Sequence, residues 1–198
     1  MSQIDAVVFD MGRVLVGLGS LVELLDEPDL TDDEFWPRWL ASPAVREFET
    51  GRIDADSFAE ALVAEVGLSI TPGEFLRRFT VWPQGLLTGV RELVASVPVT
   101  TALLSNTNAL HWFHQPDADE VRALCDRSYV SFELGMVKPD REIFDHIAAD
   151  LGVTAERILF LDDSAPNVEG ARAAGWRAER VVGVDESRAA LVAHDVLG

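Results

Sequence analysis

Short apolar runs alternate with amphipathic stretches along most of the chain. Consecutive apolar residues dominate positions 6–9, 101–104, 128–130, 158–161 and 181–182. Runs of this kind are typical of strands that are buried on both faces of a sheet. Helical spacing of apolar residues lies between them, at 86–96, 140–151 and 167–174. Strands that alternate with helices predict an α/β fold with a doubly wound parallel sheet.

Residues 18–83 interrupt this alternation, because no strand is evident there and signals for helix starts recur. These signals are N-cap residues and helix-starting prolines: Thr31 with Glu34, Ser42 before Pro43, Asp54, and Thr71 with Glu74. Abundant aromatic residues provide the segment with a small core of its own. We therefore expect an all-helical cap at 18–83, inserted after the first strand, and a core formed by 1–17 and 84–198. The cap should cover the carboxyl edge of the sheet, where open parallel sheets bind ligands.

The composition fits a packed globular protein, with 48% hydrophobic and 25% charged residues. No apolar run approaches the ~20 residues that span a membrane. Residues 1–6 lead directly into the first predicted strand without a basic, cleavable leader, and the single cysteine, Cys125, excludes an internal disulfide. Both features favour a cytoplasmic location.

The charge balance restricts the class of partner. The chain has 16 basic and 34 acidic residues, a formal net charge of −18. Such a surface repels a nucleic-acid backbone, so we expect neither a nucleic acid nor a membrane as partner. A phosphate site on this protein must be made locally cationic by a metal ion or by a well-placed lysine or arginine. The sequence leaves open whether the chain is a monomer or a homodimer.

Polar side chains follow the predicted strands at the points where these end. They are Asp10, the pair Ser105 and Asn106, Lys138, and the pair Asp162 and Asp163. Because the carboxyl ends of parallel strands meet at one edge of the sheet, we expect these groups in one crevice. A single acidic residue at a strand end is often only a cap. A set of carboxylates, a hydroxyl, an amide and an ammonium is hard to explain in that way.

Phosphoryl transfer to a carboxylate requires such a set, with a cation and a lysine that neutralise the transferring group. Mg²⁺ is the expected ion, because it prefers hard oxygen ligands and keeps several water molecules. Asp10, a backbone carbonyl nearby and one carboxylate of the Asp162–Asp163 pair would suffice to bind it.

At these positions the sequence resembles the haloacid dehalogenase-like hydrolases, in all four of their motifs. The matching segments are Phe9-Asp10-Met11-Gly12, Leu104-Ser105-Asn106, Lys138-Pro139 and Leu161-Asp162-Asp163-Ser164. Longer segments at 48–53, 105–111 and 134–139 are similar to the branch that holds glucose-1-phosphate phosphatases, and the phosphatase-like domain of soluble epoxide hydrolases is a neighbouring branch. The resemblance implies a Rossmann-like core.

The resemblance also implies roles for individual residues. Asp10 would be the nucleophile that forms an aspartyl-phosphate, and Ser105 and Asn106 would hold the phosphoryl oxygens. Lys138 would bridge the nucleophile and the phosphate. Asp163 would bind Mg²⁺ directly, Asp162 would support it or bind through water, and Gly12 would offer its carbonyl. The implied activity is Mg²⁺-dependent hydrolysis of a small phosphorylated metabolite, in particular a sugar phosphate.

Gly12 departs from the commonest pattern of the family, in which a second aspartate at this position is the general acid and base. A glycine carries no proton, and loss of such a group typically costs 10²–10⁴ in rate, as an order of magnitude. A sugar 1-phosphate releases a relatively acidic hemiacetal oxygen and would need less help. Two alternatives remain: a non-catalytic module that binds a phosphometabolite or a protein, made plausible by Gly12, and a 2-haloacid dehalogenase, which attacks carbon without a metal.

Several other residues permit both a functional and a structural interpretation. Arg13, beside the nucleophile, is a candidate to bind the substrate phosphate, although an arginine near a strand end is more often a surface residue. His111 and His114 have a spacing that permits metal binding, but no third ligand is evident and packing is the simpler explanation. Among the aromatic residues of the cap, Trp39 or Trp82 is a candidate to line a pocket.

Overall fold

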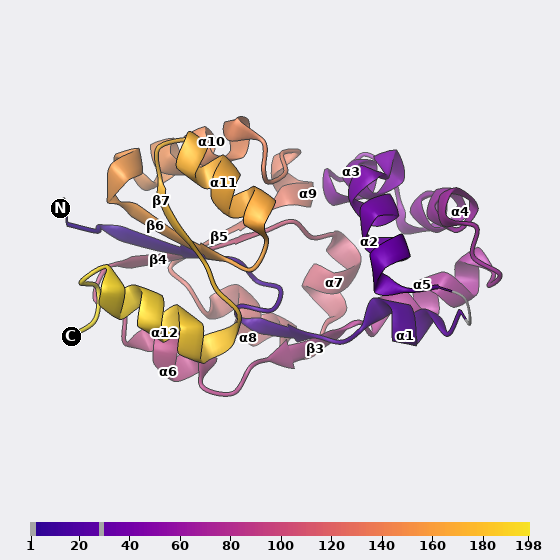
Figure 1. Cartoon of the computed structure of the whole chain (residues 1–198), viewed down its shortest axis with the longest axis horizontal. Helices are drawn as coiled ribbons and strands as arrows, with labels where there is room; N and C mark the ends of the chain where they lie inside the picture. The colour runs from indigo at the N-terminus through magenta and orange to yellow at the C-terminus, as the bar shows by residue number, and fades with distance from the viewer. Residues whose placement is uncertain (1–2, 28–29) are drawn as a thin grey trace.

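A computed structural model of the chain describes residues 3–27 and 30–198. Its centre is a five-stranded sheet in the order β5-β4-β1-β6-β7, in which every pair is parallel. The strands are β1 (Ala6–Phe9), β4 (Thr100–Ser105), β5 (Arg127–Val130), β6 (Ile158–Asp162) and β7 (Arg177–Arg180). Figure 1 shows helices on both sides of this sheet. The predicted doubly wound α/β fold is confirmed.

The two faces of the sheet have separate hydrophobic cores, and β1 contributes to both. Val7 and Phe9 point into one core, whereas Ala6 and Val8 point into the other. The first core is covered by α6 (Val90–Ala95), α7 (Ala109–His114), α8 (Ala118–Ala123) and α12 (Gly183–Ala193). The second is covered by α10 (Arg141–Leu151) and α11 (Ala165–Ala173). The short α9 (Ser131–Leu134) follows β5, and the 3₁₀ helix η1 (Ala155–Arg157) precedes β6.

In the described residues between β2 and β3, five helices pack around a third hydrophobic core, at the right in Figure 1. They are α1 (Leu21–Leu25), α2 (Asp32–Ala41), α3 (Pro43–Glu49), α4 (Ala55–Val66) and α5 (Pro72–Thr80). We call them the helical unit. Its core is rich in aromatic rings, such as the stacked pair Phe48 and Phe58, whose centroids are 4.2 Å apart.

The helix starts in the helical unit mostly follow the sequence signals. The side chains of Ser42, Asp54 and Thr71 each accept a hydrogen bond from the backbone N–H three residues later. Thr31 precedes α2 as expected, but its hydroxyl donates to the Glu34 carboxylate at 3.1 Å, and no side-chain cap to the backbone forms. Thr31 is therefore the N-cap residue by position, as predicted, but its side chain does not cap the backbone of the helix.

The chain enters and leaves the helical unit through a two-stranded antiparallel ribbon that the pattern did not predict. It pairs β2 (Val16–Leu18) with β3 (Pro83–Leu86). Both strands are short, and Gly17 and Gly85 interrupt the apolar alternation that would have revealed them. Because β3 includes Leu86, the helix predicted from residue 86 begins only at Val90, as α6.

The position of the last strand also differs from the expectation. The strand predicted at 181–182 lies at Arg177–Arg180 instead. β7 is an edge strand and carries arginine and glutamate at its partly exposed positions, so it lacks the apolar run of a central strand. We expected residues 1–6 to lead into the first strand. Residues 1 and 2 of this stretch lie outside the described residues. No helix in the described ranges is long and apolar enough to cross a membrane.

Candidate active site

The candidate residues meet at the carboxyl edge of the sheet, as the topology predicted. β1 lies between β4 and β6, so the residues after these three strands are neighbours in space. Asp10 follows β1 directly, and its backbone N–H donates to the carbonyl of Leu161 at 2.8 Å. Asp10 and Ser105 are both largely buried at the ends of their strands. The sheet therefore holds the Asp10 carboxylate in a fixed place at its edge.

Lys138 connects the strand ends through its ammonium group. The side chain is 1% exposed, and Nζ donates to a carboxylate oxygen of Asp10, to Oδ2 of Asp162 at 2.7 Å and to the carbonyl of Leu104 at 3.1 Å. An ammonium has three N–H donors, so these three acceptors saturate it. Lys138 thus joins residues from β1, β4 and β6 at one point.

The two neighbouring aspartates have different surroundings. Asp162 is fully buried, and its oxygens accept hydrogen bonds from Lys138, from the Ser164 N–H at 2.8 Å and from Asn167 Nδ2 at 3.1 Å. Asp163 lines a cavity at this edge of the sheet, and one of its oxygens lies 3.3 Å from the guanidinium of Arg13. Asp162 is therefore held by protein groups, while Asp163 faces the open space.

Asp10, Asp162 and Asp163 form a group with the donor chemistry of a divalent-cation site. One carboxylate oxygen from each lies within 4.8 Å of the others. Three carboxylates near one ammonium leave an excess of negative charge, which a hard cation would offset. Gly12 also lines the cavity beside Asp10. The residues present fit Mg²⁺, with Asp10 and Asp163 facing the cavity and Asp162 already engaged with Lys138 and Asn167.

The same charges shift the pKa of the buried groups. Burial raises the pKa of the Asp10 carboxyl to about 7, and the nearby Asp162 and Asp163 act in the same direction, whereas Lys138 opposes them. The two carboxylates around Lys138 raise the pKa of its ammonium against the effect of burial. Lys138 is therefore held in its charged form. A cation beside Asp10 would favour the ionised carboxylate, which is the nucleophilic form.

The Ser105–Asn106 segment is tied to the loop that carries Lys138. Asn106 Nδ2 donates to the Lys138 carbonyl at 2.9 Å, and its Oδ1 accepts from the Lys138 N–H at 2.8 Å. The Asn106 amide is thus engaged with the backbone. Ser131 similarly bridges both backbone groups of Thr107, at 2.9 and 3.0 Å. These bonds align the segment after β4 against the segments after β5.

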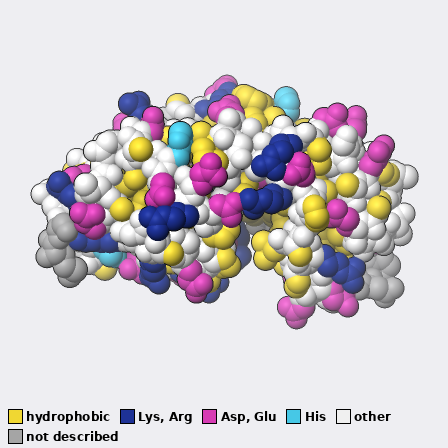
Figure 2. All heavy atoms as spheres, turned by 90° about the horizontal axis from the view of Figure 1, so that it is seen from above, with side chains coloured by type: hydrophobic (Ala, Val, Ile, Leu, Met, Phe, Trp, Pro, Cys, Tyr) yellow, Lys and Arg dark blue, Asp and Glu magenta, His cyan; other side chains and the backbone are white. Residues whose placement is uncertain are grey.

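A cavity of about 550 Å³ lies above this cluster, between the core and the helical unit. Its floor is polar and includes Asp10, Ser105, Asn106, Lys138 and Asp163. The opposite wall comes from the helical unit and is largely apolar, with Trp39, Phe79 and Trp82 among its side chains. Both tryptophans that were candidates to line a pocket do so. Figure 2 shows the hollow between the larger and the smaller part of the molecule.

Arg13 lies outside this cavity. Its side chain is 57% exposed, and its contact with Asp163 faces a smaller pocket beside Trp36. Its backbone is left-handed, with a φ of 60°. The predicted contact of Arg13 with a substrate phosphate stays a prediction, and in this structure its partner is Asp163.

Among the described residues, His111 and His114 do not belong to a group of side chains that could hold a metal ion. His111 is buried, with Nε2 2.8 Å from the Phe79 carbonyl and Nδ1 3.3 Å from the Asn108 side-chain nitrogen. Burial lowers the pKa of its ring to about 4. A neutral ring that donates from Nε2 and accepts at Nδ1 satisfies both contacts. His114 is exposed, so the packing interpretation holds for His111.

Sequence reasoning missed two side chains of the site. Asn167, in the first turn of α11, donates to both oxygens of Asp162, and its position three residues after the motif gave no signal. Glu49 lines the cavity from the end of α3. It lies in a segment that resembles a family motif, but helical spacing alone does not separate it from its exposed neighbours.

Comparison with known proteins agrees with this arrangement. A model of the haloacid dehalogenase-like hydrolase family matches residues 4–175. A D-ribitol-5-phosphate phosphatase of Bacteroides thetaiotaomicron is 29% identical over 189 residues, which cover 87% of this chain and 89% of the relative. A sesquiterpene phosphatase of Aspergillus oryzae is 27% identical over 186 residues and is matched over 86% of either chain.

Among solved structures, a similar one is a haloacid dehalogenase-family enzyme of Bacteroides thetaiotaomicron in complex with magnesium and inorganic phosphate. It matches with a TM-score of 0.74 and 22% identity, over 94% of this chain and 98% of the other. This likeness concerns the fold, including the helices between β2 and β3.

Proposed function

Because the chain belongs to the haloacid dehalogenase-like hydrolase family, we propose that it is a Mg²⁺-dependent phosphatase for a small phosphorylated metabolite, in particular a sugar phosphate. The observation that carries the proposal is the position of Asp10. Its carboxylate lies on the floor of a cavity, is hydrogen-bonded to the buried Lys138 ammonium and is close to two further carboxylates. This arrangement favours attack on a phosphorus atom over a purely structural role.

The chain's own residues provide nucleophile, orientation and charge. An Asp10 oxygen attacks the phosphorus and forms an aspartyl-phosphate, while Lys138 holds that carboxylate toward the cavity and offsets its repulsion of the incoming phosphate dianion. The hydroxyl of Ser105 donates to a phosphoryl oxygen. Asn106 keeps the segment after β4 in register with Lys138 through its two backbone hydrogen bonds.

Asp10 and Asp163 would hold Mg²⁺, with a backbone carbonyl from Gly12, and Asp162 would support them from below. Bound there, the ion would supply positive charge near the phosphoryl oxygens. The buried Asp162 fits a supporting role, because its hydrogen bonds to Ser164 and Asn167 already fix it. Arg13 would then orient Asp163 from the outer side.

A small substrate fits the dimensions of the cavity. Ligand sites for small molecules usually measure about 300–1,000 Å³, and this cavity measures about 550 Å³. We propose that the helical unit acts as a cap, whose aromatic wall packs on the carbon skeleton while the polar floor binds the phosphate. The matches to a polyol-phosphate phosphatase and to a sesquiterpene phosphatase support a phosphate monoester as substrate.

Two alternative functions receive less support. A 2-haloacid dehalogenase has no use for a cation. In this structure, however, Asp163 faces the cavity and forms, with Asp10 and Asp162, a group that could hold a cation. A non-catalytic module has no use for a nucleophile, yet Asp10 remains in place with its lysine. The phosphatase accounts for all of these residues together.

A screen of the purified protein against sugar, polyol and nucleotide phosphates tests this proposal, with Mg²⁺ and with EDTA. We expect phosphate release from at least one small sugar or polyol phosphate and its loss with EDTA. Phosphate release that EDTA leaves unchanged would overturn the metal assignment. An absence of release across the panel, with folding and Mg²⁺ binding intact, would favour the non-catalytic module.

A further inference from the structure

Gly12 leaves the proposed phosphatase without a proton carrier beside the nucleophile. A Cβ at this residue would lie 3.0 Å from Leu18 Cδ1 and 3.8 Å from an Asp10 oxygen, so the space is partly filled by Leu18. Departure of an alkoxide from a phosphate needs a proton donor, and the water that attacks the aspartyl-phosphate needs a proton acceptor. We therefore searched the cavity for another group that exchanges a proton.

Six ionisable side chains among the described residues line the cavity: Asp10, Arg46, Glu49, His111, Lys138 and Asp163. Asp10 is the nucleophile, and the Lys138 ammonium is saturated by its three acceptors. Asp163 pairs with Arg13 and belongs to the cation-binding group. Both ring nitrogens of His111 are engaged. Arginine does not release its proton in proteins, which leaves Glu49.

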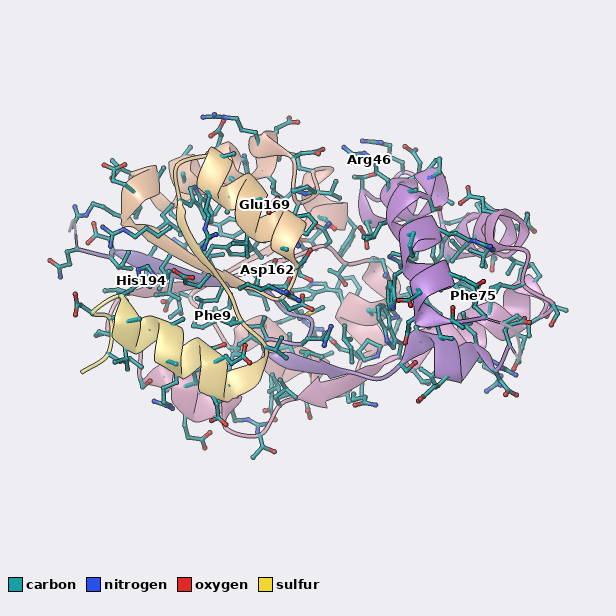
Figure 3. The ribbon with its side chains drawn as sticks, viewed as in Figure 1. Phe9, Arg46, Phe75, Asp162, Glu169 and His194 are labelled. Carbon is teal, nitrogen blue, oxygen red and sulfur yellow. The ribbon has the colours of Figure 1, made fainter. Side chains whose placement is uncertain are left out.

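Two contacts between α3 and the core hold Glu49 over the site. One turn before it, Arg46 forms an ion pair with Asp140, two residues after Lys138. Two residues after it, Gly51 has a φ of 70°, and a Cβ there would lie 2.5 Å from the Phe132 carbonyl. Figure 3 shows Arg46 at the junction of the helical unit and the core. The stretch that carries Glu49 is thus fastened to the core on both sides.

The surroundings of Glu49 suit a group that gains and loses a proton. In the described part of the chain its carboxyl makes neither a hydrogen bond nor an ion pair, although it is only partly exposed. Burial raises the pKa of this carboxyl to about 7, while the nearby Lys138 and Arg46 act in the opposite direction. Of these two cations, Arg46 is paired with Asp140 and Lys138 with Asp10 and Asp162. Both forms of Glu49 are therefore populated near neutral pH.

We propose that Glu49 is the general acid and base of the reaction, placed on the helical unit in compensation for Gly12; this inference rests on the proposed phosphatase function. In the first step an Asp10 oxygen bonds to phosphorus, the bond from phosphorus to the leaving oxygen breaks, and that oxygen takes the proton of Glu49. In the second step water attacks the phosphorus of the aspartyl-phosphate and gives a proton back to Glu49. Phosphate leaves, and the Asp10 carboxylate is restored.

This assignment explains why the segment after α3 approaches the core so closely. A proton donor on the helical unit works only when that unit contacts the core, so substrate would be hydrolysed in the arrangement of the two parts that the structure shows. The reaction would then be sheltered from bulk water by the same contacts that place Glu49.

The test compares Glu49→Gln with wild type on a series of phosphate monoesters whose leaving groups range from nitrophenols to primary alcohols. We expect kcat/KM for the primary-alcohol esters to fall by about 10²-fold or more, and kcat/KM for the nitrophenyl ester to change by less than about 5-fold, because a good leaving group departs without a proton. Glu49→Asp, which keeps a carboxyl on a shorter side chain, should retain part of the activity on alcohol esters.

Glu47→Gln is the matched control. Glu47 lies on the same helix but pairs with Arg52 at the surface, at 2.7 Å, and does not line the cavity. Its substitution should leave the leaving-group dependence unchanged. Thermal unfolding of each variant shows whether a loss of activity reflects loss of folded protein.

Three results would overturn the assignment. An equal loss of kcat/KM on all leaving groups would make Glu49 a structural residue, and a rise in KM with unchanged kcat would make it a substrate-binding group. Unchanged kinetics in Glu49→Gln would exclude any role. A wild-type protein without activity on the entire series would instead contradict the phosphatase function itself, so the two failures are distinguishable.

Discussion

At the scale of single residues, Lys138 connects the side chains of the site. It is the cation that neutralises two buried carboxylates, Asp10 and Asp162. Removal of one partner from a buried ion pair leaves an uncompensated charge, which typically costs about 3–5 kcal/mol. In the proposed function Lys138 is thus both a catalytic and a structural residue.

We predict that Lys138→Met abolishes most phosphatase activity and also lowers the thermal stability of the metal-free protein. The reason is that Asp10 and Asp162 then repel each other in a buried site. Added Mg²⁺ should recover part of the stability, because it replaces the missing positive charge. Differential scanning calorimetry with and without Mg²⁺ measures this. A Lys138→Met protein as stable and as active as wild type would place the lysine outside the site.

A second prediction concerns the effect of Glu49 on the pH dependence of folding stability. Its pKa rises from its ordinary value to about 7 on folding because of burial, so the folded state keeps a proton that the unfolded state has released. Stability therefore falls as pH increases between the unfolded and the folded pKa. Glu49→Gln removes this loss, and its Tm relative to wild type should increase from about pH 5 to about pH 8. Glu47→Gln should show no such trend, and a flat difference for Glu49→Gln would contradict the burial of the carboxyl.

The meeting of the candidate residues at one sheet edge could be predicted from the sequence, but their partners could not. Asp10 follows β1 and Ser105 ends β4, and the ends of neighbouring parallel strands converge. Lys138 lies after α9 instead of directly after a strand, and its ammonium group reaches the same edge. The different surroundings of Asp162 and Asp163 depend on which of the two side chains points toward Asn167. The family resemblance implied separate roles for the two aspartates, but the partners of Asp162 are set by three-dimensional packing and could not be derived from the local pattern.

At the scale of elements, the central strands and the edge strand β5 were predictable, whereas the edge strand β7 was not. β1, β4 and β6 are buried over nearly all of their length and each contains a run of apolar residues, whereas β7 has a single alanine among two arginines and a glutamate. The ribbon of β2 and β3 was missed for a related reason, since it has few residues and two glycines. Short or exposed strands are stabilised by pairing with neighbours, which a local pattern does not record.

The docking of α3 leads to a prediction about two glycines. Gly51 and Gly67 are both left-handed, with φ values of 70° and 77°, but only the Cβ at Gly51 would meet the core, 2.5 Å from the Phe132 carbonyl; the Cβ at Gly67 has nothing within 4 Å. Gly67→Ala should cost about 1–2 kcal/mol of stability for its backbone strain and leave activity unchanged. Gly51→Ala should cost more and also lower kcat on alcohol esters.

Urea unfolding and steady-state kinetics of both variants check this prediction. Equal activity of Gly51→Ala and Gly67→Ala would show that the contact with Phe132 does not place the helical unit for catalysis.

At the scale of the whole molecule, the protein is strongly anionic and acts on an anion in the proposed function. The net charge of −18 repels a phosphate monoester at long range, whereas Lys138 and a bound cation attract it only within the cavity. Salt screens the long-range repulsion over about 10 Å at 0.1 M. The charge composition therefore bears on association rate, while the fold provides the local site.

We predict that kcat/KM for a dianionic substrate rises with ionic strength at constant free Mg²⁺, by roughly 2- to 5-fold between low and physiological salt. The dependence should be weaker for kcat, which reports steps after binding. A fall of kcat/KM over the same range would indicate that positive charge around the cavity attracts the substrate more strongly than the net charge of the protein repels it.

The central claim is that Asp10 becomes phosphorylated during turnover. The most direct measurement is mass spectrometry of the peptide that contains Asp10 after acid quench of the wild-type protein in turnover with its substrate and Mg²⁺. The account predicts a phosphoryl group on Asp10 that appears and decays at a rate consistent with kcat, and its absence in Asp10→Asn, together with loss of activity. Turnover at the full rate with no phosphoryl group on Asp10, or an active Asp10→Asn protein, would contradict it.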